Sequence, residues 1–468
     1  MQAAEQIYRQ ILQVEPDQAD AIHLLGVIAY QVGLYEVAVE YIGRAIGLKG
    51  NVADFHNNLG NALKNRGRLD DAIACYRRAL QLKPGYADAH LNLGVALKEQ
   101  GKPDDAVACW RRALELKPDS VEAHYNLAIA LKDRGKLNEA LACYRRALEL
   151  RPDYAEAHIN LGVALKEQGK PDEAVACYRR ALELRPGCPE AHNNLGIALE
   201  EQGKLDDALA SYRRALELKP DFAQAHNNLG VAFKEQGKPD EALACWRRAL
   251  QLKPDYAEAH YNLGFGLKNQ GKLDEAVACY RRALELKPDY AQAHNNLGVA
   301  FKEQGKLDDA LACYRRALEL KPDFAEAHGN LGSALEEIGD LQGAEDCFRT
   351  ALRHDSRFPF AHYKLAELLG GTLPEQDLAA QRRLLEQIEL TDAQRLLLHF
   401  GLAQALDARG EYAEAAGHLE RGNALELSER RKCGREYDPR EHESLVTRMI
   451  GVCTPDFFAR VRGFGLES

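Results

Sequence analysis

The sequence has no apolar run long enough to cross a membrane and no excess of positive charge. A membrane-spanning helix needs about 20 consecutive apolar residues, so none is expected here. The first residues also lack the basic start and apolar stretch of a signal peptide. The net charge is −10, from 61 basic and 71 acidic residues, which counts against nucleic acid as a partner because phosphate binding needs a basic footprint. A cytoplasmic protein with neither a membrane nor a nucleic-acid partner is therefore expected.

One segment of the sequence returns every 34 residues. Nine unbroken units run from Ala53 to Phe358, and a weaker tenth covers 19–52, which gives ten units over 19–358. Residues 1–18 have the pattern of the second half of a truncated unit. Because a strict period of this length is typical of stacked repeats, the chain is expected to form one array rather than several globular domains. We number the positions of each unit from 1, starting at 53, 87, 121 and so on.

Each unit has the pattern of two helices. In the unit 155–188, Asp153 and Glu156 are spaced as a capping box at the start of the first helix. Gly169 is expected to end this helix, and Pro186 to end the second. Apolar and small residues share one face of the first helix with the spacing i, i+3, i+4 and i+7, at His158, Leu161, Gly162 and Leu165.

The unit resembles the tetratricopeptide repeat. Leu stands at position 7, Gly or Ala at 8, Ala at 20 and 27, an aromatic residue at 24, and Pro at 32 in all but the last unit. The one departure is position 4, which is His in place of the usual aromatic residue. The resemblance implies an all-α fold, a right-handed superhelix of helix-turn-helix repeats that binds protein partners in its concave groove.

Several residues that suggest chemistry fit a structural role better. Eight of the eleven cysteines occupy position 23, and neighbouring helices lie about 8–10 Å apart, farther than the roughly 7 Å that a disulfide spans. One His per unit, at position 4, cannot converge on a metal ion. A phosphate-loop interpretation of Gly94–Lys102 fails because Pro103 stands where Ser or Thr is needed. We therefore expect no catalytic residue, no metal and no cofactor in this chain, which is predicted not to be an enzyme.

One row of polar residues remains unexplained by packing. Position 6 is Asn in all nine strict units, although Asn is a poor helix former, and it lies away from the packed face. An amide both donates and accepts hydrogen bonds, so such a row can pair with the main chain of an extended peptide. It resembles the asparagine ladder of the O-linked N-acetylglucosamine transferase superhelix. The alternative is that each Asn bonds within its own or the next unit. This asparagine ladder, the predicted peptide-binding site, comprises Asn58, Asn92, Asn126, Asn160, Asn194, Asn228, Asn262, Asn296 and Asn330.

The charge of the predicted groove can be estimated from three positions. Positions 2 and 13 each carry seven acidic residues in the nine units, while position 12 carries seven Lys and two Glu. These positions sum to a marked excess of negative charge. The estimate predicts a groove that favours neutral or basic peptides and repels phosphodiesters.

After Phe358 the pattern loosens into divergent repeat-like helices over 359–429, and 430–468 has the composition of a linker. Four short segments resemble bacterial tetratricopeptide-repeat sulfotransferases: 399–403, 420–425, 437–439 and 454–458. The resemblance implies that this chain is the substrate-recruiting part of a sulfotransferase. The catalytic domain, which would bind 3′-phosphoadenylyl sulfate, is not among these residues. The alternative is a stand-alone scaffold that assembles a multiprotein complex.

Overall fold

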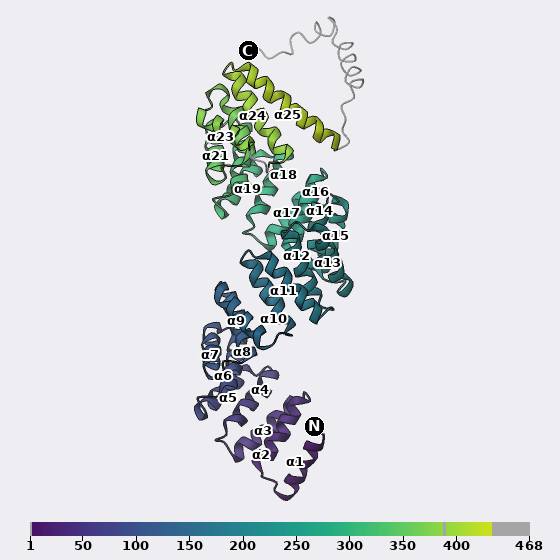
Figure 1. Cartoon of the computed structure of the whole chain (residues 1–468), viewed down its shortest axis with the longest axis vertical. Coiled ribbons are helices and arrows are strands. Elements are labelled where there is room, and N and C mark those ends of the chain that lie inside the picture. The colour runs from purple at the N-terminus through teal and green to yellow at the C-terminus, as the bar shows by residue number, and fades with distance from the viewer. Residues whose placement is uncertain (1, 387–389, 433–468) are drawn as a thin grey trace. The chain divides into compact units, whose positions relative to one another are not determined.

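Every regular element in the part of the chain that the structure describes is a helix (Figure 1). The structure is a computed structural model and describes residues 2–386 and 390–432. It forms two compact units, Met1–Pro254 and Asp255–Ser468, which are considered separately below. The predicted all-α solenoid is confirmed.

The first helix of each repeat spans 13 residues and starts at position 1, or at residue 19 in the weaker repeat. α2–α14 lie in the first compact unit and α16–α20 in the second. The first helices are α2 (Ala19–Gln31), α4 (Ala53–Asn65), α6 (Ala87–Glu99), α8 (Val121–Asp133), α10 (Ala155–Glu167), α12 (Pro189–Glu201), α14 (Ala223–Glu235), α16 (Ala257–Asn269), α18 (Ala291–Glu303) and α20 (Ala325–Glu337).

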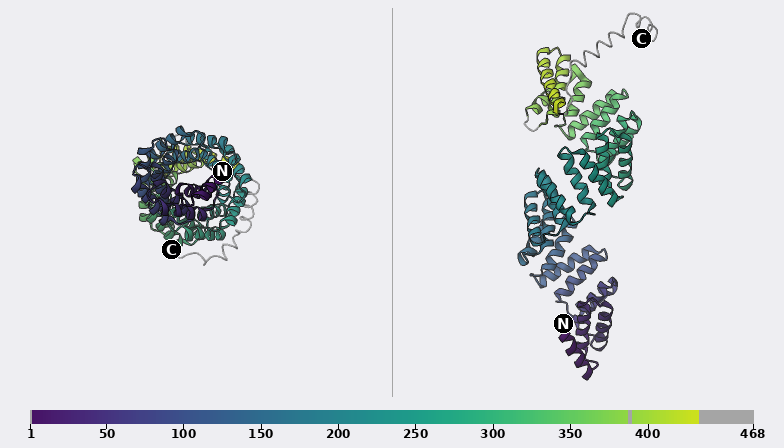
Figure 2. Two further views of the ribbon diagram at one scale, coloured as in Figure 1. Left: turned by 90° about the horizontal axis from the view of Figure 1, so that it is seen from below. Right: turned by 90° about the vertical axis from the view of Figure 1, so that its right-hand side faces the viewer.

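The second helix of each repeat spans 14 residues and packs against the first helix of the same repeat, as two further views show (Figure 2). α1 (Gln2–Val14) precedes the first full repeat and contacts α2. The second helices are α3 (Tyr35–Leu48), α5 (Leu69–Leu82), α7 (Pro103–Leu116), α9 (Leu137–Leu150), α11 (Pro171–Leu184), α13 (Leu205–Leu218), α15 (Pro239–Leu252), α17 (Leu273–Leu286), α19 (Leu307–Leu320) and α21 (Leu341–His354).

The end of each first helix follows the sequence prediction, whereas its start does not. Gly169, just after α10, has φ +77°, a left-handed conformation that favours glycine. The predicted capping box is wrong: α10 begins after Tyr154, which makes no side-chain capping bond. The carboxylate of Glu156 is instead engaged by Arg185, whose Nη1 donates to Oε1 over 2.7 Å.

The core explains the small residues of the repeat. The aromatic side chain at position 24, such as Tyr178 or Trp110, is 0% exposed and lies against position 8 of the same repeat. A Cβ on Gly162 would lie 2.6 Å from Cε1 of Tyr178, closer than real contacts allow. The small residue at position 8, Gly in eight of the nine strict repeats and Ala128 in the other, therefore lets the two helices approach closely around the aromatic ring.

Each stack of helices bends toward its first helices. Neighbouring first helices contact one another, for example α4 with α6 and α10 with α12. Among the described residues, contacts between neighbouring second helices are at most slight. We call the surface that the first helices share the first-helix face; positions 5, 6, 9, 12 and 13 lie along it.

The last helices depart from the strict repeat. α22 (Pro359–Leu369) ends early at Gly370, which has φ +50°. A 3₁₀ turn, η1 (Gly370–Thr372), and a short α23 (Glu375–Leu385) follow. α24 (Asp392–Ala408) and α25 (Tyr412–Lys432) then pack as a long pair. Most of the predicted linker at 430–468 lies outside the described residues.

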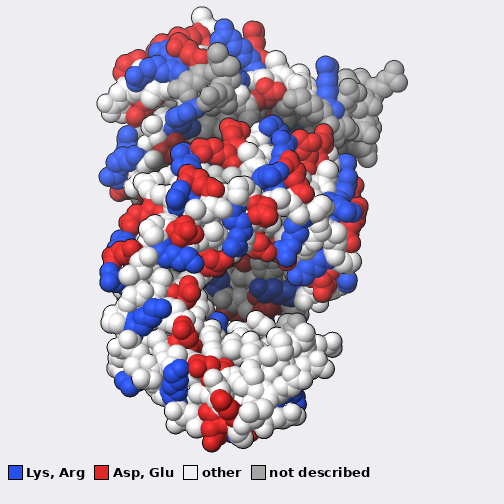
Figure 3. All heavy atoms as spheres, turned by 60° about the horizontal axis from the view of Figure 1, so that its bottom comes forward, with Lys and Arg blue, Asp and Glu red and all other residues white. Residues whose placement is uncertain are grey.

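Charge is spread unevenly along the surface. On the face shown in Figure 3, Lys, Arg, Asp and Glu intermingle over most of the surface, while the lower part has a broader area without charged residues. The sequence has no charged residue between Asp20 and Glu36. Of the helices described here, none combines the length and apolar character needed to span a membrane.

Candidate functional site

The asparagine ladder lies on the first-helix face. All nine side chains sit at mid-helix and are partly exposed. Because neighbouring first helices contact one another, each ladder amide can reach the repeat before it. The ladder is therefore positioned to serve either of the two roles considered for it, peptide binding or bonding between repeats.

Six ladder amides bond to position 5 of the preceding repeat. In each case Nδ2 donates to a polar atom 35 residues earlier in the chain: Asn58 to His23 Nε2 at 3.0 Å, Asn92 to Asn57 Oδ1 at 3.1 Å, Asn160 to Tyr125 Oη at 2.8 Å, Asn228 to Asn193 Oδ1 at 3.0 Å, Asn296 to Tyr261 Oη at 2.9 Å, and Asn330 to Asn295 Oδ1 at 3.0 Å. The geometry at these six positions is that of the alternative, bonding between repeats. Each amide retains a second N–H, because Nδ2 carries two hydrogens.

Two ladder amides have no such partner. Position 5 of the preceding repeat is Leu91 for Asn126 and Ile159 for Asn194, and neither side chain can accept a hydrogen bond. Both amides are without a hydrogen bond within the described structure. Asn262 differs from them, since it has an interaction partner. The ladder is thus uniform in sequence but not in bonding.

A second row, of ion pairs, runs beside the ladder. Lys at position 12 pairs with Glu at position 13 of the next repeat in five places: Lys64–Glu99 at 3.9 Å, Lys132–Glu167 at 3.5 Å, Lys166–Glu201 at 3.4 Å, Lys268–Glu303 at 3.9 Å and Lys302–Glu337 at 3.5 Å. The row neutralises much of the charge on the first-helix face. The Lys side chains are the more buried members, at 21–30% exposed.

The sequence-based estimate of an acidic groove needs correction. It left out position 31, which is Lys or Arg in eight of the nine strict repeats. This base pairs with the acid at position 2 of the same repeat, as in Arg151–Glu122 at 2.6 Å and Lys287–Glu258 at 3.5 Å. The hydrogen bond from Arg151 helps to hold the pKa of Glu122 below its usual value, although burial acts in the opposite direction. The face is therefore close to neutral except where a pair is missing.

At one place two carboxylates replace the pair. Position 12 of α12 is Glu200, and position 13 of the following α14 is Glu235, where five other neighbouring repeats pair Lys with Glu. Burial, together with the nearby Glu235, raises the pKa of Glu200. The hydroxyl of Tyr212 donates to Glu200 Oε2 over 2.7 Å. Among the described residues, neither Glu200 nor Glu235 has an ion-pair partner.

The other Glu at position 12 shows how the chain neutralises such a residue. Glu336 accepts from Nζ of Lys364 over 2.7 Å. Lys364 occupies position 6, where the ladder ends, and also contacts Glu367 at 2.5 Å. Its side chain is only 15% exposed. This Glu therefore has a largely buried ammonium beside it.

The histidines at position 4 have a structural role. In eight of the nine strict repeats Nε2 lies close to the main-chain carbonyl six residues earlier, in the loop before the helix, as in His158 to Pro152 at 3.0 Å and His192 to Pro186 at 3.1 Å. Since a carbonyl only accepts, Nε2 carries the proton and donates. Burial lowers the pKa of His192. The row fastens each loop to the helix that follows it.

The cysteines and tryptophans also belong to the framework. All nine cysteines in the described part of the chain are thiols. Burial raises the pKa of Cys177 and Cys313 to about 11. Nε1 of Trp110 donates to the carbonyl of Leu91 over 3.2 Å. Within the residues described, no group of three or more His, Cys, Asp and Glu could hold a metal ion.

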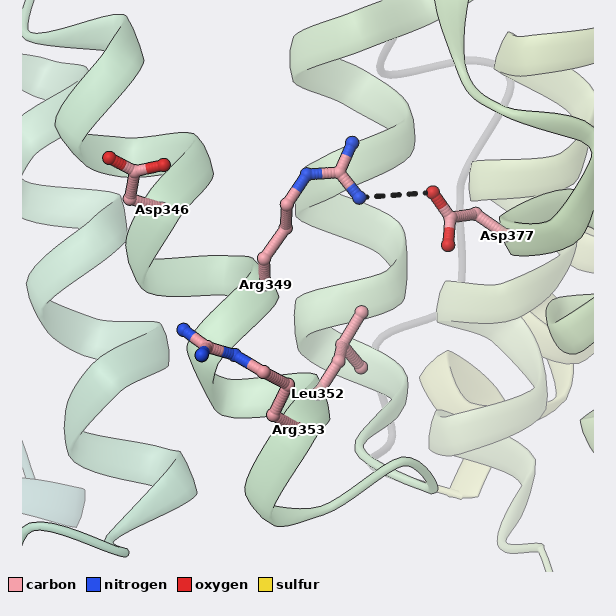
Figure 4. A pocket seen from close by; sticks show the side chains of 5 residues that line it. All are labelled: Asp346, Arg349, Leu352, Arg353 and Asp377. Atoms are coloured by element: carbon pink, nitrogen blue, oxygen red, sulfur yellow. Dashed lines mark hydrogen bonds and ion pairs between the residues drawn. The ribbon is translucent and has the colours of Figure 1, made fainter.

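Two hollows open on the surface of the described helices. One, of about 150 Å³, lies on the first-helix face between α2 and α4 and is lined in part by Tyr30, Asn58 and Asn61. The other, of about 670 Å³, lies between α21 and α23 (Figure 4). There Arg349 is already engaged by Glu345 at 2.7 Å and by Asp377 at 3.3 Å. The charge of Arg349 is thus neutralised within the protein. The hollow beside Asn58 is therefore the better candidate for part of a binding site.

One buried pair was not anticipated from the sequence. Nδ1 of His399 in α24 lies 2.9 Å from Nδ1 of His418 in α25. The two residues are 9% and 8% exposed. Burial and the neighbouring His418 lower the pKa of His399 to about 4. A spacing of 19 residues is also that of Trp110 and its acceptor Leu91, and could have indicated a contact across a helix pair.

Comparison with known families agrees with the repeat. Models of the tetratricopeptide repeat match residues 19–52, then 60–101, 96–133 and 130–169, and finally 396–421. A model described as the C-terminal domain of cilia and flagella-associated protein 70 matches residues 153–368. No curated protein matches the sequence.

Similar solved structures include YrrB, described as a TPR protein with an unusual peptide-binding site. It is 26% identical over 39% of this chain and 95% of its own, with a TM-score of 0.35. Two structures of MamA are 29% and 28% identical; they cover 36% and 37% of this chain and 97% and 96% of their own, with TM-scores of 0.34 and 0.35. The chain carries tetratricopeptide repeats, which indicate a scaffold for protein–protein interaction.

Proposed function

We propose that the first-helix face binds extended segments of partner proteins, with the asparagine ladder contacting their main chain. The observation that carries the proposal is the repetition of one partly exposed amide per repeat on the first-helix face of each compact unit. Every one of these amides has more hydrogen-bonding capacity than its neighbours use, since even an occupied Nδ2 keeps one N–H. A peptide main chain presents carbonyl and N–H groups at regular intervals that such a row can meet.

The test is a peptide selection on the whole chain. Random 15-residue peptides displayed on phage are selected against the protein, and fluorescein-labelled versions of those recovered are titrated by anisotropy. Replacing Asn126, Asn160, Asn194 and Asn228 together by Ala should cost about 2–6 kcal/mol of affinity, at about 0.5–1.5 kcal/mol for each lost hydrogen bond. That is a loss of about 30-fold or more.

The control changes the opposite face. Arg146 and Arg180 lie on second helices, paired with Glu149 at 2.8 Å and Glu183 at 2.7 Å, and are about half exposed. Replacing both by Ala should leave peptide affinity unchanged. If this variant loses binding while the ladder variant keeps it, the second helices hold the partner, as in a scaffold without groove binding. Recovery of no peptide would overturn the proposal.

We also propose, on the resemblance of the C-terminal segments, that the repeats recruit the substrate of a sulfotransferase. Residues 399–403 and 420–425 lie in α24 and α25, while 437–439 and 454–458 lie outside the described residues. The gene sequence beyond Ser468 tests this proposal. A following domain that opens with a Pro-Arg-Ser-Gly-Thr phosphate loop would support it, and a stop codon there would leave the stand-alone scaffold.

A further inference from the structure

The residue at position 5 determines whether the ladder amide of the next repeat is occupied. Wherever position 5 is His, Tyr or Asn within one compact unit, the following ladder Asn donates to it, as Asn160 does to Tyr125 and Asn228 to Asn193. Where position 5 is Leu91 or Ile159, the following amide has no such acceptor. The unoccupied amides therefore fall at two places in the first compact unit, on α8 and α12.

Unmet polar groups gather between these two helices. Asn126 on α8 and Asn194 on α12 are both partly buried amides without a hydrogen bond among the described residues. Behind α8 and α10, the buried hydroxyls of Tyr144 and Tyr178 are also without a partner, as is that of Tyr280 elsewhere in the described chain. Tyr178 lies within electrostatic range of Glu201, the last residue of α12. A buried polar group without a partner costs about 1–3 kcal/mol, and the two ladder amides, unlike the fully buried hydroxyls, are partly exposed and can be met by a peptide.

The spacing fits a short extended segment. α8 and α12 are separated by α10 along the row of first helices, and adjacent packed helices lie about 8–10 Å apart, so the two amides are about 16–20 Å apart. An extended chain rises about 3.3 Å per residue. About five or six residues would therefore join a main-chain group at Asn126 to one at Asn194.

The charge at α12 indicates which side chain this segment carries. Glu200 and Glu235 interrupt the row of Lys–Glu pairs. Glu200 accepts a hydrogen bond from Tyr212, but among the described residues no cation forms an ion pair with it. The equivalent Glu336 is met by the ammonium of Lys364 at 2.7 Å. At the position that corresponds to Lys364, the repeat after Glu200 has the neutral Asn228. Lys234 acts on Glu200 only as a through-space charge.

We propose that α8 to α12 form the preferred seat for an extended peptide, whose main chain is held by Asn126 and Asn194 and whose Lys or Arg side chain is received by Glu200. This inference rests on the proposed function, since it specifies where on the first-helix face a peptide binds and which side chain it needs. The proposal also specifies at which of the near-identical repeats the peptide binds.

The first test occupies the amide of Asn194 without replacing any residue that is proposed to contact the peptide. Ile159→Asn places an acceptor before Asn194, as Asn193 does before Asn228. Peptides recovered from the phage library should bind this variant of the whole chain about 3- to 10-fold more weakly, because a bond to the preceding repeat takes one of the two N–H groups that Asn194 otherwise offers the peptide. Ile159→Leu, which keeps the position apolar, should bind as the wild type does. The converse change, Asn57→Leu, releases Asn92 on α6, beside the seat, without altering Asn126, Asn194 or Glu200, and should not weaken binding.

The second test exchanges charge on both partners. Replacing the Lys or Arg of a recovered peptide by norleucine should weaken binding to the wild type at least 10-fold, but at most 2-fold to Glu200→Lys, in which a Lys again faces Glu235. Recovered peptides that lack a basic residue, or an Ile159→Asn variant with wild-type affinity, would overturn this inference while leaving the proposed function standing. If no peptide is recovered, or if the fourfold ladder variant binds normally, the proposed function itself fails.

Discussion

Asn160 donates through Nδ2 to the hydroxyl of Tyr125, 2.8 Å away in the repeat before it. This bond joins two first helices, α10 and α8, through the very side chain that the sequence assigns to peptide binding. A ladder Asn thus contributes to the stability of the stack as well as to the surface it presents. The two roles are separable because Asn194, one repeat further on, has an apolar residue where Asn160 has Tyr125.

The first prediction separates occupied from unoccupied ladder amides by stability. Replacing Asn160 and Asn228 by Ala removes two hydrogen bonds between repeats, at about 0.5–1.5 kcal/mol each, and should lower the midpoint of urea unfolding. Replacing Asn126 and Asn194 should leave the midpoint unchanged or raise it, since Ala is the better helix former by about 0.7 kcal/mol. Equal effects of the two double variants on the midpoint would contradict the division of the ladder.

The second prediction concerns the glycine at position 8. A Cβ on Gly162 would lie 2.6 Å from the ring of the fully buried Tyr178, so Gly162→Ala should destabilise the protein by about 1–3 kcal/mol through overpacking. Gly43, inside α3, has no atom near its would-be Cβ. Gly43→Ala should therefore stabilise the protein by about 0.5–1 kcal/mol, because Ala loses less entropy in a helix. Urea unfolding measures both, and a neutral Gly162→Ala would show that the ring can move away.

How far the sequence predicts this protein can be judged from particular residues. Gly169 and the strict period place the helix ends correctly, because a left-handed glycine and a proline leave little freedom in where a helix stops. The start of α10 was mispredicted, because Glu156 has two competing uses and its ion pair with Arg185 prevails. That competition depends on a residue 29 positions away, which is adjacent only once the two helices have packed.

The candidate site was predicted as a row of equivalent amides, but not in its differences. Asn126 and Asn194 are distinguished by Leu91 and Ile159, which lie 35 residues earlier and touch the ladder only through the stacking of repeats. Leu91 and Ile159 stand in the sequence, but their effect on the two ladder amides depends on the register between neighbouring helices. The same holds for charge, because the base at position 31 neutralises an acid at position 2 across a helix pair.

The third prediction concerns thiol reactivity. Burial raises the pKa of Cys177 and Cys313 to about 11. Only about 0.1% of such a thiol is thiolate at pH 8, so alkylation of the native protein by iodoacetamide should be slow at both residues. Reaction in urea should be fast, because an exposed thiol titrates near its ordinary value of about 8.5. Peptide mapping by mass spectrometry measures each site separately, and rapid native labelling of Cys177 would refute the prediction.

The last prediction concerns pH and the pair His399–His418. With Nδ1 of each 2.9 Å apart, one nitrogen donates and the other accepts, so the pair holds only one proton at the contact. Burial and His418 lower the pKa of His399 to about 4, whereas an exposed His titrates near 6.5. Because the folded pKa is the lower one, the contribution to stability is complete above pH 6.5 and is lost as the pH falls toward 4.

The pairing of α24 with α25 should therefore loosen as the pH falls from 7 to 5. Hydrogen exchange followed by mass spectrometry, corrected for the intrinsic effect of pH, should show faster exchange in α24 and α25 at pH 5. His418→Gln serves as the control, because its amide can donate to His399 but cannot titrate. This variant should reduce the pH dependence of exchange in α24 and α25, since half of the titrating pair is gone. If the wild type and His418→Gln respond equally to pH, the pair does not govern the stability of these two helices.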